Sequence, residues 1–512
     1  SDPILRTKVT MAADQVLPTS PIQASSVDCW DYEANVVVIG CGGAGACAAL
    51  SAHDAGASVM IFELASDIGG STALSSAEVY LGAGTRVQKA TGHKDTKQGM
   101  TDFLTAAAGP QADAEKIEAY VEGSTDHFDW LVTQGVPFKD SEYPHRAIMA
   151  LTDDCLLYTG GENAYPYNTL ASPAPRGHNL EVSGDNGGPL LMKTLGARLN
   201  ERSIPIHLNS RALALIVDEI NQQQVVVGVK VRIDMQERYV KALSGVILAT
   251  GGFVMNQKMV RQYAPELTRC TVPIGNPGDT GTGILMGMGV GGQVINMHEG
   301  FVSLPFYPPA SLTYGLFINS QGQRFVNEDS YHGRVGSLIL RQTGDRVYLI
   351  LGVEDYGNYE TESYLNADVV ATADSVPELE SDLNLPQGQL QSTIRDYNKS
   401  VELGVDYAFH KDPRWLKAIE PPYVALDVTP GRGAFFPYFT LGGLDTLPSG
   451  EVLKANGEVV CGLYAIGRTA CGIPRRGEGY ASGMSVGDAT FSGRQAGLAA
   501  ANRMMIERNA NG

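Results

Sequence analysis

Residues 35–63, with the sequence NVVVIGCGGAGACAALSAHDAGASVMIFE, decide the fold that we expect for this chain. The apolar, β-branched run 36–39 indicates a strand that is buried on both faces, as in a parallel sheet. A turn follows, in which Gly40, Gly42 and Gly45 have the spacing G-x-G-x-x-G. An Ala-rich segment then predicts a helix, and a second apolar run predicts another strand. This order of elements predicts a βαβ unit that binds a dinucleotide.

Each glycine of the turn has its own role in such a unit. Gly40 allows the tight turn, Gly42 lets the backbone approach a pyrophosphate, and Gly45 lets the helix pack closely on the strand. The positive end of the helix and its free N–H groups face the phosphates. Glu63 follows Gly45 by eighteen residues, where its carboxylate is placed to accept hydrogen bonds from ribose hydroxyls. The alternative, a glycine-rich turn between core elements, does not explain Glu63.

Length, composition and charge limit the possible classes of function. The chain of 512 residues allows roughly two to four domains, and its hydrophobic fraction of 43% is ample for a large core. A formal net charge of −18 argues against nucleic acid or an anionic membrane as a partner. Apolar runs are short and interrupted, so we expect no integral membrane segment. The start, SDPILRTKVTMAADQ, lacks an apolar core, so we expect no signal peptide.

The cysteines predict the compartment and exclude several metal centres. There are seven of them, an odd number, and no two form a C-x-x-C pair. This usage is typical of free thiols in a reducing cytoplasm rather than of a disulfide framework. It also disfavours a zinc site, a c-type haem and an iron–sulfur cluster, so we expect no metal site. Electrons would then leave through another protein or a soluble acceptor, whose identity stays open.

A second glycine pair indicates the cofactor. Residues 64–77, LASDIGGSTALSSA, place Gly69 and Gly70 before Ser71 and Thr72. With this pair the chain resembles the FAD-dependent succinate dehydrogenase/fumarate reductase superfamily, in which the loop wraps the FAD pyrophosphate and ribityl chain. The resemblance covers most of the chain. It implies an α/β fold, in which a Rossmann-like FAD-binding domain carries an inserted α+β capping domain for the substrate. The loop contains no His, so we expect non-covalent FAD.

The resemblance and the composition together predict the domain boundaries. The inserted domain begins where aromatic residues and proline become dense, in FVSLPFYPPASLTYGLF. The expected parts are a polar lead-in at 1–33, the first part of the FAD-binding domain at 34–298, the inserted capping domain at 299–429, and the second part of the FAD-binding domain at 430–512.

Periodicity predicts many of the elements. Residues 141–187 are rich in Gly, Pro and Asn and are expected to form extended loops. Helical patterns are expected over 96–135, 189–200, 385–404 and 484–507. Strands are expected at 206–208, at 212–217, 224–232 and 238–243 as an antiparallel meander, and at 246–249 as a separate buried strand.

The resemblance implies further FAD contacts beyond the first βαβ unit. Ala212 lies in a strand that bonds adenine through its backbone, and ATGG at 249–252 and GNPGDTGTG at 275–283 line the cofactor. The last helix begins near Ser485 and Val486, and its positive end would face the flavin O2. Asp279 can alternatively cap the helix that follows it. The expected cofactor-binding residues are Gly40, Gly42, Gly43, Ala44, Gly45, Glu63, Gly69, Gly70, Ser71, Thr72, Ala212, Thr250, Gly251, Asp279, Ser485 and Val486.

Three blocks resemble the active site of the superfamily but depart from the fumarate reductases. They are GQRFVNEDSYHGR (322–334), FTLGGL (439–444) and RRGEGYASGMSVGDATFSGRQAG (475–497). A catalytic arginine is missing after the first block's R-F-V-N-E, and Phe439 and Tyr480 stand where the fumarate reductases have a His and a second arginine. An apolar site with phenols disfavours a dicarboxylate, because buried carboxylates would lack partners. Arg324, Arg475 and Arg476 keep that alternative open.

In all three blocks the chain resembles the 3-ketosteroid dehydrogenases. Tyr331 and Tyr480 match their two tyrosines, but residues 481–483 read Ala-Ser-Gly where the Δ1 enzymes have Pro-Gly-Pro-Gly. The resemblance is therefore to the Δ4-(5α) type, which desaturates a 5α-3-ketosteroid between carbons 4 and 5. It implies that Tyr480 and an N–H near Gly483 hold the 3-keto oxygen. Ser482 with Tyr331 would take the carbon-4 proton, and a hydride would pass to flavin N5.

Each of these residues also has a purely structural interpretation. Tyr331 can be a phenol at a domain junction, Ser482 the N-cap of the last helix, and Tyr480 packing under the flavin. The aromatic side chains that can line a flat apolar pocket, or belong to the core, are Phe301, Phe306, Tyr307, Tyr314, Phe317 and Phe439.

Three competing functions follow from the sequence. The first is the FAD-dependent ketosteroid desaturase, of Δ4 or alternatively Δ1 type, acting on a small apolar ketone. The second is a fumarate-reductase-like enzyme that reduces another unsaturated acid or ketone. The third is an FAD-binding redox carrier that needs a partner protein for its chemistry.

Overall fold

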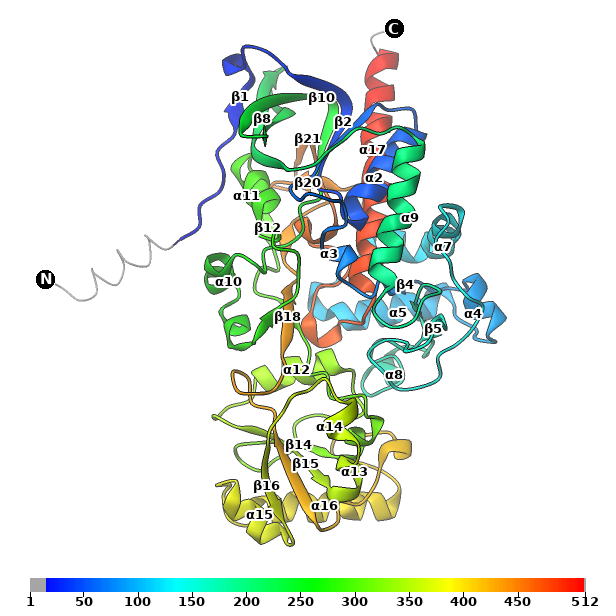
Figure 1. The fold of residues 1–512 in the computed structure, drawn as a ribbon, viewed down its shortest axis with the longest axis vertical. Helices are drawn as coiled ribbons and strands as arrows, with labels where there is room; N and C mark the ends of the chain where they lie inside the picture. The colour runs from blue at the N-terminus through cyan, green and yellow to red at the C-terminus, as the bar shows by residue number, and fades with distance from the viewer. Residues whose placement is uncertain (1–14, 511–512) are drawn as a thin grey trace, which may run out of the picture.

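The structure is a computed structural model that describes residues 15–510, with side chains up to Arg503. The first fourteen residues of the expected lead-in lie outside the described part. The molecule is elongated, with a large sheet at one end and a smaller antiparallel sheet at the other (Figure 1). It is mixed α/β, as predicted.

The large sheet carries the predicted βαβ unit. Its strand order is β1-β8-β9-β21-β10-β2-β3-β7, and β20 pairs with β21. The parallel strands are, in spatial order, β21 (Val459–Ala465), the second half of β10 (Gln236–Leu248), β2 (Tyr32–Ile39), β3 (Val59–Phe62) and β7 (Ile206–His207). The remaining strands of this sheet are β1 (Ile22–Gln23), β8 (Ser210–Ile220), β9 (Gln223–Ile233) and β20 (Glu451–Leu453).

The unbroken apolar run of β2 has a direct packing reason. Val36 and Val38 belong to a core on one face of the sheet, and Val37 and Ile39 belong to a second core on the other face. Both faces of the strand are therefore covered, which explains why the sequence does not alternate between apolar and polar residues.

Helices α2 (Gly43–Asp54), α9 (Gly187–Glu201) and α17 (Met484–Ala510) run side by side along this sheet (Figure 1). A Cβ on Gly493 or Gly497 of α17 would lie 2.3 Å from a carbonyl oxygen of α2. The two helices therefore pack at backbone contact, with the first turns of α2 against Gly493 and Gly497 of α17.

One strand differs from the prediction. Residues 238–243 and 246–249 were expected as two strands, but both belong to β10. Its first half pairs antiparallel with β9 and its second half pairs parallel with β21, whereas β2 pairs parallel with both halves, with an irregularity between Ala242 and Gly245. The sequence Ser244-Gly245 looked like a turn, but the glycine serves a close approach, because a Cβ there would lie 2.8 Å from the Tyr464 ring.

The predicted helical region 96–135 contains α5 (Lys97–Ala108), α6 (Ala114–Glu122) and α7 (Ser124–Thr133), so the prediction is confirmed. Residues 141–187 are mostly irregular, as expected, and contribute only β5 (Leu156–Leu157), α8 (Tyr167–Leu170) and β6 (Gly177–His178). The strand β4 (Val79–Tyr80) pairs with β6 and brings this loop system against the βαβ unit.

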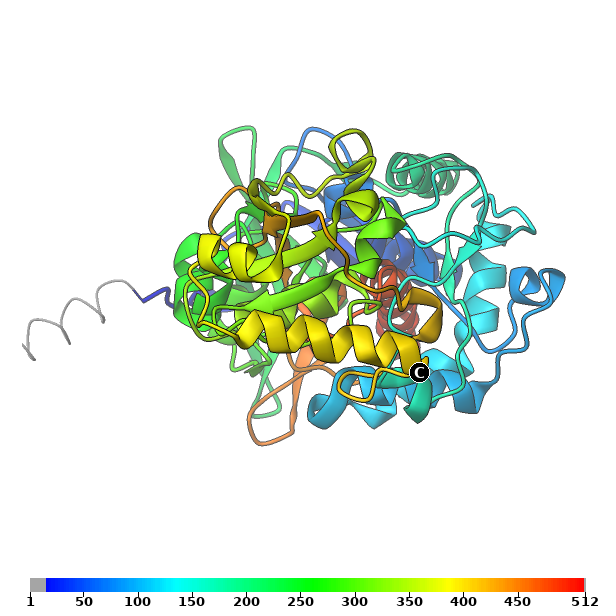
Figure 2. The ribbon, with the colours of Figure 1, turned by 90° about the horizontal axis from the view of Figure 1, so that it is seen from below.

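The smaller antiparallel sheet lies within residues 299–429 and has its own core. Figure 2 shows its helices from below, with α15 (Val376–Asp382) and α16 (Gln389–Leu403) across the lower end of the molecule. Its strands are, in spatial order, β14 (Leu316–Asn319), β15 (Val347–Gly352), β17 (Tyr423–Asp427) and β16 (Val369–Ala373). The exact domain boundaries stay a prediction.

The remaining short elements lie around the two sheets and between them (Figure 1). The helices are α3 (Gly70–Ala73), α4 (Arg86–Ala90), α10 (Gln257–Tyr263), α11 (Thr282–Gly289), α12 (His332–Leu340), α13 (Val353–Tyr356) and α14 (Tyr359–Glu362). The strands are β11 (Val272–Pro273), β12 (Val294–Ile295), β13 (Gly300–Val302), β18 (Pro437–Thr440) and β19 (Gly443–Leu444).

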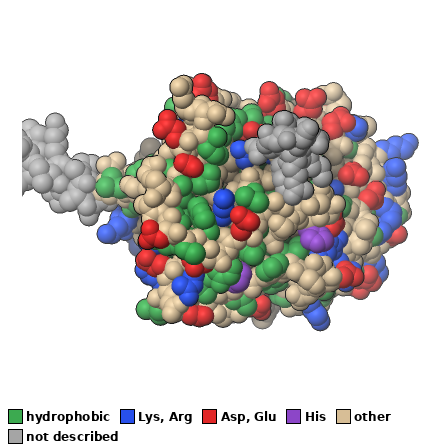
Figure 3. Space-filling model, turned by 90° about the horizontal axis from the view of Figure 1, so that it is seen from above, with side chains coloured by type: hydrophobic (Ala, Val, Ile, Leu, Met, Phe, Trp, Pro, Cys, Tyr) green, Lys and Arg blue, Asp and Glu red, His purple; other side chains and the backbone are tan. Residues whose placement is uncertain are grey.

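Surface charge and helix hydrophobicity relate to two expected absences, a nucleic-acid partner and an integral membrane segment. Acidic and basic side chains are interspersed on the face that Figure 3 shows, without a large basic area. Among the described helices, none is both long and apolar enough to cross a membrane.

Candidate active site

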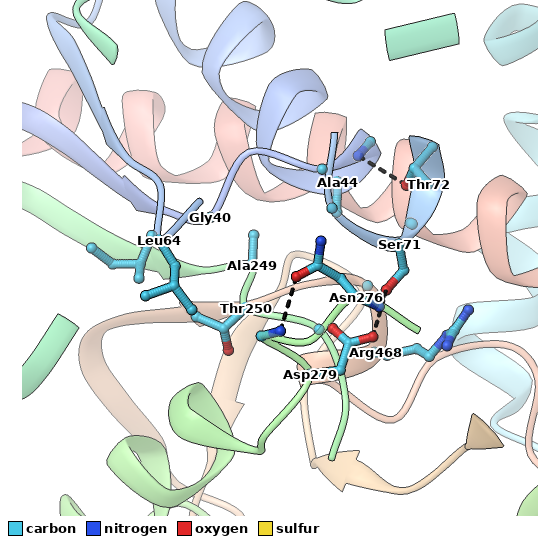
Figure 4. Close-up of a pocket in the computed structure, with 18 of the residues that line it drawn as sticks. Gly40, Ala44, Leu64, Ser71, Thr72, Ala249, Thr250, Asn276, Asp279 and Arg468 are labelled. Atoms are coloured by element: carbon cyan, nitrogen blue, oxygen red, sulfur yellow. Dashed lines mark hydrogen bonds between the residues drawn. The ribbon is translucent and has the colours of Figure 1, made fainter. Parts of the chain in front are cut away.

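A pocket of about 1080 Å³ opens at the carboxyl ends of four parallel strands. Residues that directly follow β2, β3, β10 and β21 line it, together with the starts of α2 and α17 (Figure 4). Ligands of open α/β sheets bind at this edge, because the strand ends and helix N-termini converge there. All predicted cofactor-binding residues except Gly45 and Gly69 line the pocket.

Gly40 and Gly45 are required by close packing within the protein, whereas Gly42 is not. A Cβ on Gly40 would lie 2.1 Å from the Ala249 carbonyl oxygen, and one on Gly45 would lie 2.0 Å from the Gly40 carbonyl oxygen. Gly42 has an ordinary φ of −84°, and a Cβ there would meet no protein atom closer than 3.5 Å. Gly42 nevertheless lines the pocket. A glycine at 42 is therefore explained by a ligand that approaches the backbone, which fits a dinucleotide pyrophosphate.

Gly69 does not line the pocket but holds the glycine turn in place through a hydrogen bond. Its N–H donates to the Cys41 carbonyl at 2.8 Å, which fixes the second glycine loop against the first. The Thr72 hydroxyl accepts a 3.0 Å hydrogen bond from the Gly43 N–H at the first residue of α2. Gly45 and Gly69 thus shape the cradle, and their neighbours line it.

Glu63 organises the end of the sheet as well as the pocket. Its two carboxylate oxygens accept hydrogen bonds from the backbone N–H groups of Cys41 (2.9 Å) and Ala65 (2.7 Å). Each carboxylate oxygen has more than one lone pair. Because Glu63 also lines the pocket, its carboxylate can hold the turn and accept from a ribose hydroxyl at once.

Asp279 does not cap a helix, so that alternative is wrong. The helix α11 is preceded by Gly281, whose position has no side-chain cap, and Asp279 instead accepts a 2.5 Å hydrogen bond from the Ser71 hydroxyl. The Ser71 hydroxyl in turn accepts from the Asn276 N–H at 2.9 Å. Burial raises the pKa of Asp279, and the nearby Arg468 partly opposes the shift. The contact joins two segments that are distant in the sequence across one wall of the pocket (Figure 4).

Sequence reasoning missed several residues of this wall. Arg468 lines the pocket, and its guanidinium lies 4.0 Å from the centre of the Phe439 ring. A cation in the loop directly after a parallel strand was the signal that could have found it. Ala249, Gly252, Asn276, Gly278 and Thr282 also line the pocket and belong to the two expected segments 249–252 and 275–283. Other lining residues that were not predicted are Ile39, Phe62, Leu64, Ser75, Ser210, Arg211, Ile466, Gly467 and Ala489.

The three predicted active-site blocks come together beside this pocket. The hydroxyls of Tyr331 and Ser482 lie 2.6 Å apart and share a hydrogen bond. The Tyr480 ring packs on Phe301 (4.6 Å between centroids) and on Phe439 (5.6 Å). The site is therefore a buried group of phenol, hydroxyl and aromatic side chains, as the sequence predicts.

Tyr480 connects this group to the pocket. Its hydroxyl donates to the Ser485 hydroxyl at 2.9 Å, and Ser485 lines the pocket. The Ser485 N–H also lies 3.4 Å from the Tyr480 oxygen. Ser485 can thus accept from Tyr480, or donate to it when the phenol points its proton elsewhere.

Ser482 is not the N-cap of the last helix, so that interpretation is also wrong. The helix α17 begins at Met484, and Gly483, with a φ of +94°, occupies the preceding position. The Ser482 hydroxyl turns to Tyr331 instead. Its backbone is held by the hydrogen bond from its N–H to the Thr159 carbonyl at 2.9 Å.

Both phenols are neutral in this environment. Burial raises the pKa of Tyr331 well above its usual range, and the neighbouring Tyr480 adds to the shift. Burial also raises the pKa of Tyr480, although the hydrogen bond with Ser485 opposes it. Neutral phenols donate hydrogen bonds, so they can stabilise a developing enolate but are poor bases on their own.

The three arginines that kept a dicarboxylate substrate open are bound to other protein groups. Arg324 makes ion pairs with Glu328 (2.7 Å) and Asp406 (2.9 Å). Arg475 pairs with Asp113 at 3.2 Å, and Arg476 donates to the carbonyls of residues 106 and 107. Arg324 and Arg475 are thus paired with protein carboxylates, and Arg476 is held by backbone carbonyls.

The aromatic residues separate into two groups. Phe301 and Phe439 contact Tyr480, whereas Phe306 and Phe317 pack on one another at 5.0 Å within the core. The remaining two tyrosines lie against other partners. Tyr307 accepts from the His332 N–H at 3.1 Å, and Tyr314 packs on Trp415 at 5.4 Å.

Comparisons with known proteins identify the family of the chain. Residues 35–479 match the model of the FAD binding domain family. A crystal structure of 3-ketosteroid-Δ4-(5α)-dehydrogenase from Rhodococcus jostii RHA1, in complex with 4-androstene-3,17-dione, is 40% identical with a TM-score of 0.89, and the match covers 94% of this chain and 99% of that one. A 3-oxosteroid 1-dehydrogenase of Mycolicibacterium smegmatis is 28% identical over 91% of this chain and 97% of its own length. A fumarate reductase (cytochrome) of Shewanella frigidimarina is 28% identical over 91% of this chain and 77% of its own length.

The chain therefore belongs to the FAD binding domain family. Within it, the protein is an FAD-dependent oxidoreductase related to the fumarate reductases and the ketosteroid dehydrogenases, and its cofactor is FAD.

Proposed function

We propose that the protein desaturates 5α-3-ketosteroids between carbons 4 and 5, to give 4-ene-3-ones. The observation that carries the proposal is the 2.6 Å contact between the Tyr331 and Ser482 hydroxyls beside Tyr480. The similarity to a Δ4-(5α)-dehydrogenase whose structure contains 4-androstene-3,17-dione supports the same substrate class.

In this proposal the carbonyl end of the substrate is held by Tyr480 and the Gly483 N–H. Tyr480 would turn its proton from Ser485 to the keto oxygen and accept from Ser485 in exchange, which the 2.9 Å contact permits. Two donors on the oxygen lower the pKa of the neighbouring carbon-4 proton by stabilising the enolate. FAD, when bound, supplies the acceptor for the hydride that leaves carbon 5.

The proton of carbon 4 goes to the Ser482 hydroxyl in this scheme. A serine hydroxyl is a weak base, so it needs a partner that takes its own proton as it receives the new one. Tyr331 is that partner, since its hydroxyl already shares a hydrogen bond with Ser482. The aromatic rings of Phe301 and Phe439 keep this region apolar and would pack on the flat face of the substrate.

The choice of the Δ4 reaction over the Δ1 reaction rests on Ser482. The segment Ala481-Ser482-Gly483 places a hydroxyl where the Δ1 resemblance would predict none. The same site with a different substrate register would give a 1-ene product, so the product itself decides between the two reactions.

A second candidate function rests on Arg468. This cation lines the cofactor pocket and, among the described residues, has no carboxylate within ion-pair distance. It could therefore bind the carboxylate of an unsaturated acid and serve a reductase of the fumarate reductase type.

We also propose three properties that follow from the sequence. FAD is held without a covalent bond, because the Gly69-Gly70 loop contains no His. The seven cysteines are free, which suits the reducing cytoplasm. The electron acceptor is a separate protein or small molecule.

The test is anaerobic reduction of the FAD-loaded enzyme by 5α-androstane-3,17-dione, followed by the loss of the flavin's visible absorption and by analysis of the steroid. We expect prompt bleaching and a 4-ene-3-one product. Reoxidation of the chemically reduced enzyme by an unsaturated acid, without bleaching by the steroid, would favour the reductase instead.

Two phenylalanine variants sharpen this test. Tyr480→Phe removes the carbonyl donor, and we expect flavin reduction to slow about 100- to 1000-fold, as for the loss of one oxyanion donor. Tyr438→Phe is the matched control, because Tyr438 is also buried and its hydroxyl bonds Gln257 at 3.2 Å, away from the proposed chemistry. Equal rates in the two variants would contradict the role of Tyr480.

A further inference from the structure

The proposed chemistry leaves one proton inside the protein. Tyr331 is buried, and neither Tyr331 nor Ser482 can keep an extra proton, because the two hydroxyls only exchange one between them. Turnover therefore needs a third group that accepts the proton and passes it to water.

Glu78 is a buried carboxyl group that, among the described residues, has no hydrogen bond of ordinary length. It is 3% exposed, and one of its oxygens accepts a long hydrogen bond of 3.3 Å from the Ser76 hydroxyl. Its other oxygen is buried without a hydrogen-bond partner among the described residues. Native proteins rarely leave such an atom unpaired, so this oxygen calls for an explanation.

A second buried glutamate nearby shows what a structural carboxyl looks like. Glu162 accepts from the Tyr80 hydroxyl with one oxygen and from the Gly160 N–H with the other, each at 3.0 Å. Both of its oxygens are thus satisfied, in contrast to those of Glu78.

The backbone places Glu78 beside Gly483, the residue that follows Ser482. It precedes β4, whose Tyr80 N–H donates to the Gly483 carbonyl at 3.0 Å. A Cβ on Gly483 would lie 3.1 Å from the carbonyl atoms of Glu78. Residue 78 therefore runs against the segment that carries Ser482.

The charge of Glu78 also reaches the phenols of the site. A carboxylate at 78 raises the pKa of Tyr331, of Tyr480 and of Tyr307. These tyrosines come from three separate segments of the chain. Glu78 therefore lies within electrostatic reach of all three phenols.

We propose that Glu78 accepts the proton that Ser482 and Tyr331 remove from the substrate and releases it to solvent by way of Ser76. The inference rests on the proposed function. The carbon-4 C–H bond breaks and its proton bonds to the Ser482 oxygen. The Ser482 proton passes to Tyr331, and the Tyr331 proton passes to the Glu78 carboxylate. The electron pair of the broken bond forms the new double bond, as the carbon-5 hydrogen leaves with its own pair to FAD.

The ionisation of Glu78 suits this role. Burial raises its pKa to about 8, so both of its forms are populated near neutral pH, as an efficient proton acceptor requires. The tyrosines that face it stay protonated near neutral pH, because burial raises the pKa of Tyr307, Tyr331 and Tyr480. Burial also raises the pKa of Glu162, and the hydrogen bond from Tyr80 opposes that shift. Arg176, which donates to the Tyr80 hydroxyl, is paired with Asp95 at 2.9 Å.

The exit to solvent is short. Ser76 is only half-buried, and its hydroxyl is the one group that bonds the Glu78 carboxyl in the described structure. As a relay residue, Glu78 acts on the substrate only through Tyr331 and Ser482.

The test compares Glu78→Gln with Glu162→Gln in the FAD-loaded enzyme. The rate of flavin reduction by 5α-androstane-3,17-dione is measured anaerobically from about pH 6 to about pH 10, and steroid affinity is measured from the spectral change of the flavin. We expect the wild-type rate to rise with pH through about 8, because only the ionised carboxyl accepts a proton. Glu78→Gln should reduce the rate at least about 100-fold and abolish this rise, with steroid affinity unchanged. Glu162→Gln should keep the rise.

Several outcomes separate the relay from the proposed function. If the wild-type flavin is not reduced by the steroid, the proposed function fails. If it is reduced, and Glu78→Gln keeps both the rate and the pH dependence, the relay alone is wrong. Should Glu78→Gln fail to bind FAD, Glu78→Asp is the test. We expect it to retain a displaced pH dependence, and an unchanged midpoint would overturn the proposal.

Discussion

At the scale of single residues, the hydroxyl pair is the feature on which the chemistry depends. Tyr331 and Ser482 are 151 positions apart in the chain, and their oxygens share one hydrogen bond of 2.6 Å. Residues that act as a unit are grossly non-additive when they are removed, because the first loss already disables the unit.

We therefore expect a marked non-additivity between Tyr331→Phe and Ser482→Ala. Each single variant should slow flavin reduction by about two to four orders of magnitude, and the double variant should be no slower than the worse single one. The measurement is single-turnover reduction with matched FAD content. Independent, multiplying effects would show that the two hydroxyls do not cooperate.

Glu78 should also be visible in the stability of the protein. Its pKa is raised in the folded state, so the folded protein binds its proton more tightly than the unfolded chain does. The contribution is favourable below the unfolded pKa and is lost as pH rises from about 4.5 to about 8. At pH 7 the buried carboxyl costs on the order of 3 kcal/mol relative to a group that does not titrate.

Glu78→Gln should remove this cost. We expect its melting temperature to fall less steeply than that of the wild type between about pH 5 and about pH 8, as measured by calorimetry at several pH values. Parallel curves for the two proteins would mean that Glu78 has an ordinary pKa.

Several residues of the site were predictable because their chemistry is local. Gly40, Gly42, Gly45 and Glu63 follow from one continuous stretch of sequence. Glu78 was not, because nothing in its immediate sequence indicates a function, and Arg468 was missed although it closely follows a parallel strand. Their importance comes from burial and from neighbours that only the fold supplies.

At the scale of elements, the first βαβ unit distinguishes packing from ligand binding. Gly45 is required by the helix–strand contact, whereas Gly42 is free of protein contacts closer than 3.5 Å. Two substitutions in the same turn should therefore have different consequences.

We expect Gly42→Ala to fold and to lose FAD affinity, because its methyl group would enter the pocket without a clash in the protein. Gly45→Ala should lower the stability of the fold itself, since its Cβ would lie 2.0 Å from the Gly40 carbonyl oxygen. FAD titration together with thermal unfolding of the FAD-free protein measures both effects. Similar unfolding temperatures for the two variants would contradict this division.

The strand β10 shows where periodicity is insufficient. Its sequence changes at Ser244-Gly245 because the strand exchanges one neighbour there, the antiparallel β9 for the parallel β21, while β2 pairs with it on both sides. Glycine in a strand also serves the approach of another group, here the Tyr464 ring. A single sequence does not show whether the glycine of Ser244-Gly245 serves a turn or a close contact within a strand.

At the scale of the whole molecule, the site is assembled from segments that are far apart in the chain. The carboxyl ends of four parallel strands form the cofactor pocket, and the blocks around Tyr331, Phe439 and Tyr480 meet beside it. The large sheet and its helices hold the pocket, and the connecting strands β13 and β18 bring Phe301 next to Phe439. The family resemblance predicted this assembly, whereas pattern and propensity alone predicted only its parts.

The most direct test of the central claim is the kinetic isotope effect on flavin reduction with a 5α-3-ketosteroid that carries deuterium at carbon 5. We predict slower reduction with the label at carbon 5, no primary effect of a label at carbon 1, and a 4-ene-3-one as the product. A primary effect at carbon 1 with a 1-ene product would contradict the proposed position of the new double bond.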